Sequence, residues 1–208
     1  MLVICLFRPL MRAIAWAPLL VTGVLAIAMI GLLDAGSPLD SGDSLTLLRM
    51  MGPLLGAAAG FTVLDEMAAA TAANPVSRGL RHRIRCLAGG LTAGAWWAVT
   101  CAIAVARLPE GGVLRLPGMA VEAATCIVAG LLAVSVAARF YQGRAAVLAG
   151  MGGLLGVFSV TLVLHGPYWP WLYPDRPTWE VVHYGWSAAL VLLLVALDVT
   201  GRGPRGTR

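Results

Sequence analysis

The sequence contains few charged residues and no lysine. Charged residues make up 12% of the 208 residues, and all fifteen basic residues are arginine. A soluble domain usually carries about 25% charged residues, because its wet surface is large. With 59% hydrophobic residues and a mean hydropathy of +0.83, the composition excludes an ordinary soluble domain. It predicts an all-α integral membrane protein with a single transmembrane domain.

The motifs of the common enzyme and cofactor classes are also absent. The four cysteines show no C-x-x-C spacing, and the three histidines lie at or beyond the ends of the hydrophobic runs, away from a mid-membrane haem position. We find no nucleophile elbow, no glycine-rich phosphate loop and no zinc-protease histidine pair. The chain is therefore predicted to have no catalytic, metal or cofactor site of its own. Its cysteines are expected to be buried thiols.

Six hydrophobic runs approach the ~20 residues that a helix needs to cross about 30 Å of hydrocarbon. They cover residues 13–33, 47–64, 86–106, 119–138, 145–164 and 181–197. The first run is too long for a typical signal peptide, and no small-residue cleavage site follows it, so we expect it to remain as an anchor. The sequence thus predicts about six transmembrane helices.

Arginine is distributed unevenly between the connections. With the N-terminus placed inside, eleven arginines fall in cytoplasmic segments and four in outer segments. The positive-inside rule therefore predicts that the N- and C-termini are both cytoplasmic. The net charge of +5 follows from the same bias and needs no nucleic-acid partner. Because the exclusive use of arginine is typical of a GC-rich genome, we expect a multi-pass protein of a bacterial cytoplasmic membrane.

Few ionisable residues fall within the runs. Glu122 lies about one turn inside the outer end of the fourth run, and Arg49 lies near the outer end of the second. Asp65, Glu66 and Asp198 lie at cytoplasmic ends. We interpret each as a headgroup-level residue whose polar end reaches water. The lack of deeper charge argues against a proton-coupled carrier and favours an apolar pathway over an ion channel.

Glycines recur at a spacing of four in three of the runs. Gly52, Gly56 and Gly60 form such a series in the second run. The pairs in the third and fifth runs are Gly90 with Gly94 and Gly152 with Gly156. Small faces of this kind let two helix backbones approach closely. The glycines are predicted to pack helices, either within the chain or in a dimer.

The longest cytoplasmic connection, residues 65–85, is rich in alanine and arginine. Its alanines can continue the second helix beyond the membrane, and Asn74-Pro75 ends that helix because a residue before proline disfavours the α conformation. Ser77 can then cap a new helix that runs through the basic stretch. The result is an elbow that leaves the membrane and returns. It serves either as a solvated turn whose arginines contact anionic lipid or as a docking site for a cytoplasmic partner.

Most of the tryptophans and tyrosines lie in the outer connection, residues 166–180, or at the start of the last run. Prolines in this connection rule out one long helix. Because such aromatic residues settle at the headgroup level, the segment is either an aromatic belt or an outer gate over a translocation path. The gate would consist of Trp169, Trp171, Trp179, His183 and Trp186. The irregular spacing of His165, Asp175, Glu180 and His183 argues against a metal site.

These features together resemble the exporter-type permeases of ATP-binding-cassette transporters. The shared layout is six spans with both ends inside, an elbow between spans two and three, and a short structured outer segment between spans five and six. Two stretches are more narrowly similar to small actinobacterial permeases. They are the loop with Leu64-Asp65-Glu66, Thr71, Pro75 and the basic run from Arg78 to Arg85, and the spacing of Trp179, His183 and Trp186.

The resemblance implies a permease subunit that works in a dimer of membrane subunits, identical or different, with two separate cytoplasmic ATPase subunits. The elbow would be the coupling helix that seats in a groove on each ATPase. Its docking residues would be Ala69, Thr71, Asn74, Pro75, Arg78 and Arg81. ATP and Mg²⁺ would bind the partner subunits and not this chain.

We therefore expect a transport subunit that exports an amphipathic or lipid-like substrate. Two other hypotheses stay open. One is a non-transporting anchoring or assembly subunit of a membrane complex. The other is a membrane enzyme that uses the outer histidines and carboxylates, and it requires activity to be lost when His165 or His183 is replaced by alanine. Binding of an ATPase at the elbow separates the transport subunit from the anchor.

Overall fold

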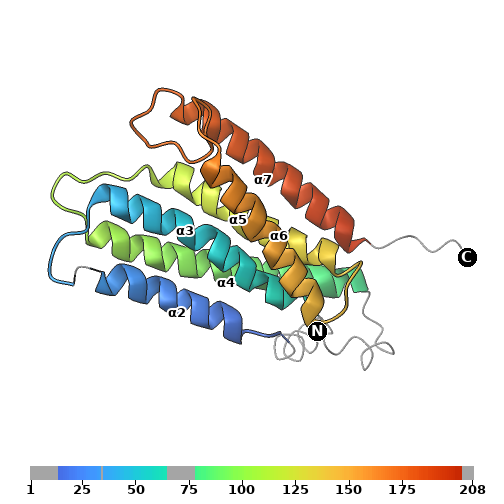
Figure 1. The fold of residues 1–208 in the computed structure, drawn as a ribbon. Helices are drawn as coiled ribbons and strands as arrows, with labels where there is room; N and C mark the ends of the chain where they lie inside the picture. The colour runs from blue at the N-terminus through green and yellow to red at the C-terminus, as the bar shows by residue number, and fades with distance from the viewer. Residues whose placement is uncertain (1–13, 34, 65–77, 203–208) are drawn as a thin grey trace, which may run out of the picture.

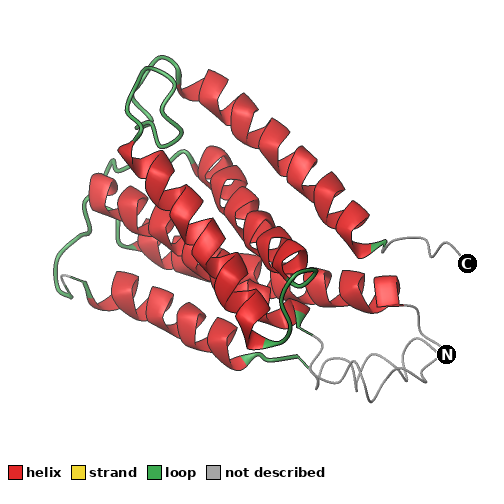
Figure 2. Cartoon of the chain, turned by 45° about the vertical axis from the view of Figure 1, so that its right-hand side comes forward, coloured by secondary structure: helices red, strands yellow, loops and turns green. Residues whose placement is uncertain are grey.

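The computed structural model describes residues 14–33, 35–64 and 78–202. Six α-helices follow one another: α2 (Ala17–Leu32), α3 (Ser41–Gly60), α4 (Arg78–Ala106), α5 (Leu116–Ala137), α6 (Arg144–Val163) and α7 (Trp179–Gly201). A 3-10 turn, η1 (Phe61–Val63), continues α3. Within the described ranges there is no strand, and a single isolated bridge joins Ala35 to Ser37. The predicted all-helical fold is thus confirmed for these residues (Figures 1 and 2).

Five of the helices, α3 to α7, are long and apolar enough to cross a membrane. The sixth, α2, has 16 residues and covers about 24 Å at 1.5 Å per residue, less than the ~30 Å of hydrocarbon. It begins at Ala17 because Pro18 suits the first helical turn, and it ends where Leu33 becomes extended. Five potential spans and one shorter apolar helix indicate a membrane protein.

Three helices extend at least four residues beyond the hydrophobic runs of the sequence. α3 begins at Ser41 rather than at residue 47, because the Asp40 side chain accepts a hydrogen bond from the Gly42 N–H (2.8 Å) and caps the helix. α4 begins at Arg78, so its basic residues belong to the helix. α7 continues to Gly201.

α3 occupies the centre of the bundle. It packs on α2, α4, α5 and α6 and is mostly buried, whereas α7 lies along one flank, packs mainly on α5 and has Trp179 as its single fully buried residue (Figures 1 and 2). The start of α4 and the end of α7 meet at one end of the bundle, where Gly79 lies against the Gly201 carbonyl. The turn after α5 reaches the same end, because Arg139 Nη2 donates to the Thr200 carbonyl (3.1 Å).

Glycines form the contact between α3 and α5. A Cβ at Gly56 would overlap the Cys126 carbonyl, and a Cβ at Gly130 would overlap the backbone of Gly56. Gly52 and Gly60 also face α5. Because no side chains stand between them, the two backbones touch, as in other small-residue helix pairs. The series in α3 therefore packs two helices of this chain.

The other glycine pairs are placed differently. Gly90 of α4 lies against Leu131 of α5. No described atom lies within 4 Å of the position that a Cβ would take at Gly94, Gly152 or Gly156. The small face of α6 is therefore not used by the described helices of this chain.

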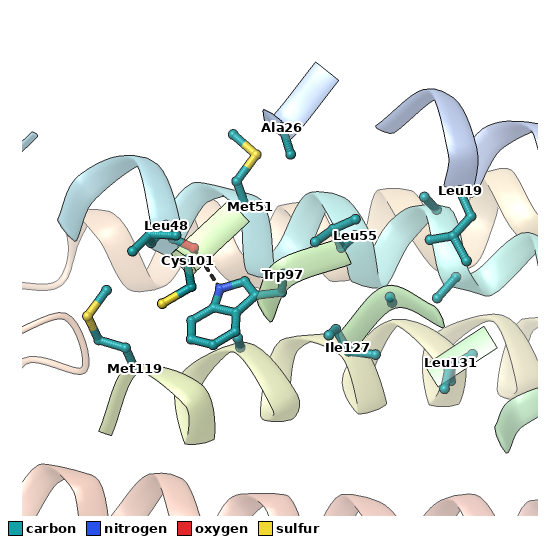
Figure 3. Close-up of a cluster of buried hydrophobic side chains, with 14 of the residues drawn as sticks. Leu19, Ala26, Leu48, Met51, Leu55, Trp97, Cys101, Met119, Ile127 and Leu131 are labelled. Carbon is teal, nitrogen blue, oxygen red and sulfur yellow. Dashed lines mark hydrogen bonds between the residues drawn. The ribbon is translucent and has the colours of Figure 1, made fainter. Parts of the chain in front are cut away.

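The hydrophobic core lies between α2, α3, α4 and α5. Trp97 of α4 is buried there and donates its indole N–H to the Leu48 carbonyl (3.3 Å), beside Met51, Leu55 and Ile127 (Figure 3). The prediction of buried thiols is confirmed for the three described cysteines, Cys86, Cys101 and Cys126.

Candidate functional site beneath the connection of α6 and α7

A buried ion pair joins α3 to α5. Arg49 of α3 donates from Nε to Oε2 of Glu122 (2.9 Å) and from Nη2 to Oε1 (2.8 Å). Arg49 is 8% exposed and Glu122 is 2% exposed, so the pair is enclosed by protein. Two parallel bonds fix the planes of the guanidinium and the carboxylate, which a lysine would not do.

The same guanidinium holds the cap segment, residues 164–178, which connects α6 to α7. Arg49 Nη1 donates to the Trp171 carbonyl and Nη2 to the Leu172 carbonyl, each at 2.7 Å. With the two bonds to Glu122, four of its five N–H groups have acceptors. Arg49 therefore neutralises a carboxylate and satisfies two carbonyls of buried residues.

His183 of α7 contacts the same carboxylate. Its Nε2 lies 3.0 Å from Glu122 Oε1, and its Nδ1 lies 2.8 Å from the Trp179 carbonyl one turn earlier. Both neighbours are acceptors, so a neutral imidazole donates to one of them and an imidazolium donates to both. Glu122 thus links α3, α5 and α7 at one point.

Tryptophan rings surround the charged groups. The rings of Trp171 and Trp179 have their centroids 5.9 Å and 5.6 Å from Arg49 Cζ, a range in which a ring face attracts a cation. The Trp179 ring is also tilted against the His183 ring, with centroids 3.9 Å apart. The cation is therefore held by a carboxylate, two carbonyls and two aromatic rings.

The ion pair is dry. The space bounded by Arg49, Glu122, Trp97 and Trp171 has no room for a water molecule. In such surroundings attraction between charges is stronger than in water, and removing one partner leaves an unpaired buried charge. The pair therefore constrains the relative positions of α3, α5 and the cap segment.

Indole N–H groups tie the cap segment to the neighbouring helices. Trp171 Nε1 donates to Thr161 Oγ1 (3.0 Å), and Trp169 Nε1 donates to the Thr161 carbonyl (2.9 Å). Trp186 of α7 donates from Nε1 to the Pro170 carbonyl (2.9 Å). The prolines of the segment prevent a regular helix, so its carbonyls are available to accept these bonds.

The burial of Arg49 and Glu122 shows that the prediction of two headgroup-level residues was wrong. The side chains do not reach for water, because each neutralises the other inside the bundle. The expected absence of buried charge, which favoured an apolar pathway over an ion channel, is wrong for the same reason. The useful signal in the sequence was one basic and one acidic residue, each near the same predicted end of an otherwise apolar run.

Asp198 lies at the opposite end of the bundle, as expected of a residue at the end of a span. Its side chain is partly exposed and pairs with Arg83 Nη2 (2.7 Å) and with Arg202. Asp65 and Glu66 lie outside the described residues.

Four of the five residues predicted to form an outer gate converge on the buried pair. Trp171, Trp179 and His183 contact it directly, and Trp186 packs against Trp171 with ring centroids 5.0 Å apart. Trp169 lies away from the pair, at the C-terminal end of α6. The role of a gate remains a prediction.

Most of the predicted docking residues lie outside the described residues. These are Ala69, Thr71, Asn74 and Pro75. Arg78 is the first residue of α4. Arg81 is buried. The docking role of these residues remains a prediction.

No group of three or more His, Cys, Asp or Glu side chains is arranged to hold a metal ion within the described part of the chain. His183 contacts Glu122, and Glu180 lies 3.7 Å from Arg115. His165 is exposed and stacks on a tryptophan ring. The histidines and carboxylates considered for an outer metal site therefore have different partners.

Replacing His183 with alanine is expected to lower the free energy of unfolding by about 1 to 2 kcal/mol, because Glu122 loses one charged hydrogen bond but keeps Arg49. Thermal unfolding of the protein in detergent micelles measures the change. His165→Ala is the matched control, since that side chain is exposed, and its effect should stay within about 0.5 kcal/mol. Equal losses for the two variants would contradict the role given to His183.

The site is thus a charged, water-free joint between α3, α5, α7 and the cap segment. Comparison with known proteins gives no match: no family model, no curated protein and no solved structure is similar to the chain. What the chain does is therefore inferred from its own residues.

Proposed function

We propose that the chain is the permease subunit of an ATP-driven exporter in a bacterial cytoplasmic membrane. It crosses the membrane six times, with both ends in the cytoplasm. It works beside a second permease subunit, and separate ATP-binding-cassette subunits bind and hydrolyse ATP with Mg²⁺. The substrate is amphipathic or lipid-like.

The observation that carries the proposal is the cap segment folded over one end of the bundle. Arg49 donates hydrogen bonds to two backbone carbonyls of the cap segment. The space beside the Arg49–Glu122 ion pair has no room for a water molecule. A transporter with alternating access needs such a closure at one end, which opens and closes as a unit. α3 ends and α4 begins at the other end of the bundle, and the ATPase would dock at the connection between them (Figure 1).

The distribution of arginines supports the orientation. The start of α4, the turn after α5 and the end of α7 meet at one end of the bundle, and they carry Arg83, Arg139 and Arg202. The positive-inside rule places that end in the cytoplasm. The cap segment then faces outward.

The nature of the site also favours an amphipathic substrate over an ion. The buried charges are paired with each other and enclosed, so they offer no row of binding positions to a passing ion. The open small face of α6, with Gly152 and Gly156, suits close packing against a second membrane subunit.

An anchoring or assembly subunit that transports nothing is the alternative. It is favoured by α7, which is apolar and exposes large hydrophobic side chains from Val181 to Val199, and therefore offers a broad surface to another membrane protein. Such a subunit would not need an ATPase.

The test is co-purification from cells that express the tagged chain with its genomic neighbours. Replacing residues 69–77 by a Gly/Ser linker of equal length leaves α4 intact and should remove a stoichiometric ATPase from the purified complex. The control replaces residues 109–113, in the connection at the other end, and should retain the ATPase. If the wild-type chain brings down a membrane complex without any ATPase, the anchoring subunit takes the place of the transporter.

A further inference from the structure

A cavity of about 380 Å³ lies between α4, α5 and α7, near the end of the bundle where α4 begins and α7 ends. Its walls are mainly apolar and include Leu87 and Leu91 of α4, Leu131 of α5 and Leu194 of α7. The volume falls in the range of about 300 to 1,000 Å³ that is typical of sites for small ligands. None of its lining residues belongs to the joint around Arg49.

The cavity is a groove that faces outward from the bundle. Leu91 is 72% exposed, Leu87 is 63% exposed and Leu194 is 48% exposed, so the mouth of the groove would meet hydrocarbon in a membrane. Along α4 it runs from His82 to Leu91, about 13 Å at 1.5 Å per residue. At the end of the groove near His82, Gly201 of α7 lies against the His82 ring.

Charged groups gather at the end of the groove near His82. Arg83 and Asp198 line the groove there and form an ion pair, and Arg202 shares the same carboxylate. Arg139 is adjacent, because its Nη2 donates to the Thr200 carbonyl. Two guanidinium groups share the Asp198 carboxylate, and a third binds the Thr200 carbonyl nearby, which leaves a positive surplus that favours an anionic group at this position.

The lining of the groove selects the kind of occupant. Its walls are apolar along α4, and its charged side chains, Arg83 and Asp198, lie at one end. A hydrocarbon chain matches the apolar walls. An anionic head on such a chain would lie beside the arginines.

We propose that this groove binds one anionic phospholipid, with an acyl chain along α4 between Leu87 and Leu91 and the phosphate beside Arg83. The bound molecule comes from the leaflet on the side where α4 begins. The site goes beyond the proposed transport function, because it requires neither an ATPase partner nor turnover.

Native mass spectrometry of the purified chain tests the site. The protein is released from micelles that contain phosphatidylglycerol or phosphatidylcholine with the same acyl chains. We expect one retained lipid, with phosphatidylglycerol bound about fivefold more tightly because one arginine contributes to anionic recognition. Equal retention of the two lipids by the wild-type chain would overturn the anionic preference.

Two pairs of variants separate the groove from the rest of the surface. Leu194→Trp fills the groove and should weaken phosphatidylglycerol binding at least tenfold, whereas Leu192→Trp, on another exposed part of α7, should not change it. Arg83→Gln should abolish the preference for phosphatidylglycerol, and Arg83→Lys should keep it, since lysine is also a point charge for phosphate. Unchanged binding by Leu194→Trp would place the lipid elsewhere.

A measurement on the wild-type chain does not depend on how the variants fold. Phosphatidylglycerol with a photoreactive group in its acyl chain should label residues 82–91 and 194–198. Labels spread evenly over the exposed faces of α6 and α7 would mean ordinary contact with surrounding lipid and would overturn the site.

Discussion

Replacing Glu122 with alanine is expected to lower the free energy of unfolding by about 3 to 5 kcal/mol, because it leaves the buried guanidinium of Arg49 without its carboxylate. The loss is large because Arg49 is only 8% exposed, so its remaining charge lies in buried surroundings. Unfolding in detergent micelles, followed by heat or by a denaturing detergent, measures it. The matched control is Glu180→Ala, whose carboxylate is exposed and 3.7 Å from Arg115, and its effect should stay within about 0.5 kcal/mol.

A double variant distinguishes burial of charge from loss of packing. Arg49→Leu together with Glu122→Leu removes both charges at once and should recover most of the loss, since a buried pair is often replaced by apolar residues at little cost. A double variant as unstable as Glu122→Ala would show that unpaired charge is not what destabilises the single variant.

Gly56→Leu is expected to lower the free energy of unfolding by about 3 kcal/mol or more. Its side chain would have to enter the contact between α3 and α5, where even a Cβ overlaps the Cys126 carbonyl and lies 3.1 Å from Ile127 Cα. The backbones would have to separate, and Arg49 on the same helix would move away from Glu122. The yield of monodisperse protein and its thermal unfolding in detergent measure the effect.

Gly94→Leu is the control for that variant. No described atom lies within 4 Å of the Cβ position at Gly94, so leucine there should be tolerated within about 1 kcal/mol. If Gly56→Leu were tolerated equally well, it would contradict the direct backbone contact between α3 and α5.

The sequence predicted the helices better than it predicted their partners. Long apolar runs specify α3 to α7, because a helix satisfies its own backbone in lipid. The sequence did not predict the start of α3 at Ser41, next to the Asp40 cap. The first residues of the helix are mostly polar, so they do not belong to the hydrophobic run. The series Gly52, Gly56 and Gly60 indicated a packing face, but its partner Gly130 belongs to no such series and could not be identified from spacing.

The joint was missed for a physical reason. A single charge near the end of an apolar run is the usual pattern of a residue that reaches the headgroups, and Arg49 and Glu122 each show it alone. Their pairing depends on how α3 and α5 cross, over a separation of 73 residues. By contrast, Trp179, His183 and Trp186 follow helical spacing, so that part of the site could be predicted from the sequence.

The most direct test is hydrogen–deuterium exchange of residues 166–178 in the wild-type chain and in the variant with Arg49→Leu and Glu122→Leu. If Arg49 holds the cap segment, these amides exchange slowly in the wild type and at least tenfold faster in the double variant, while those of α3 and α5 change little. Equal exchange of residues 166–178 in the two proteins would contradict the claim that the buried pair fastens the cap segment to the bundle.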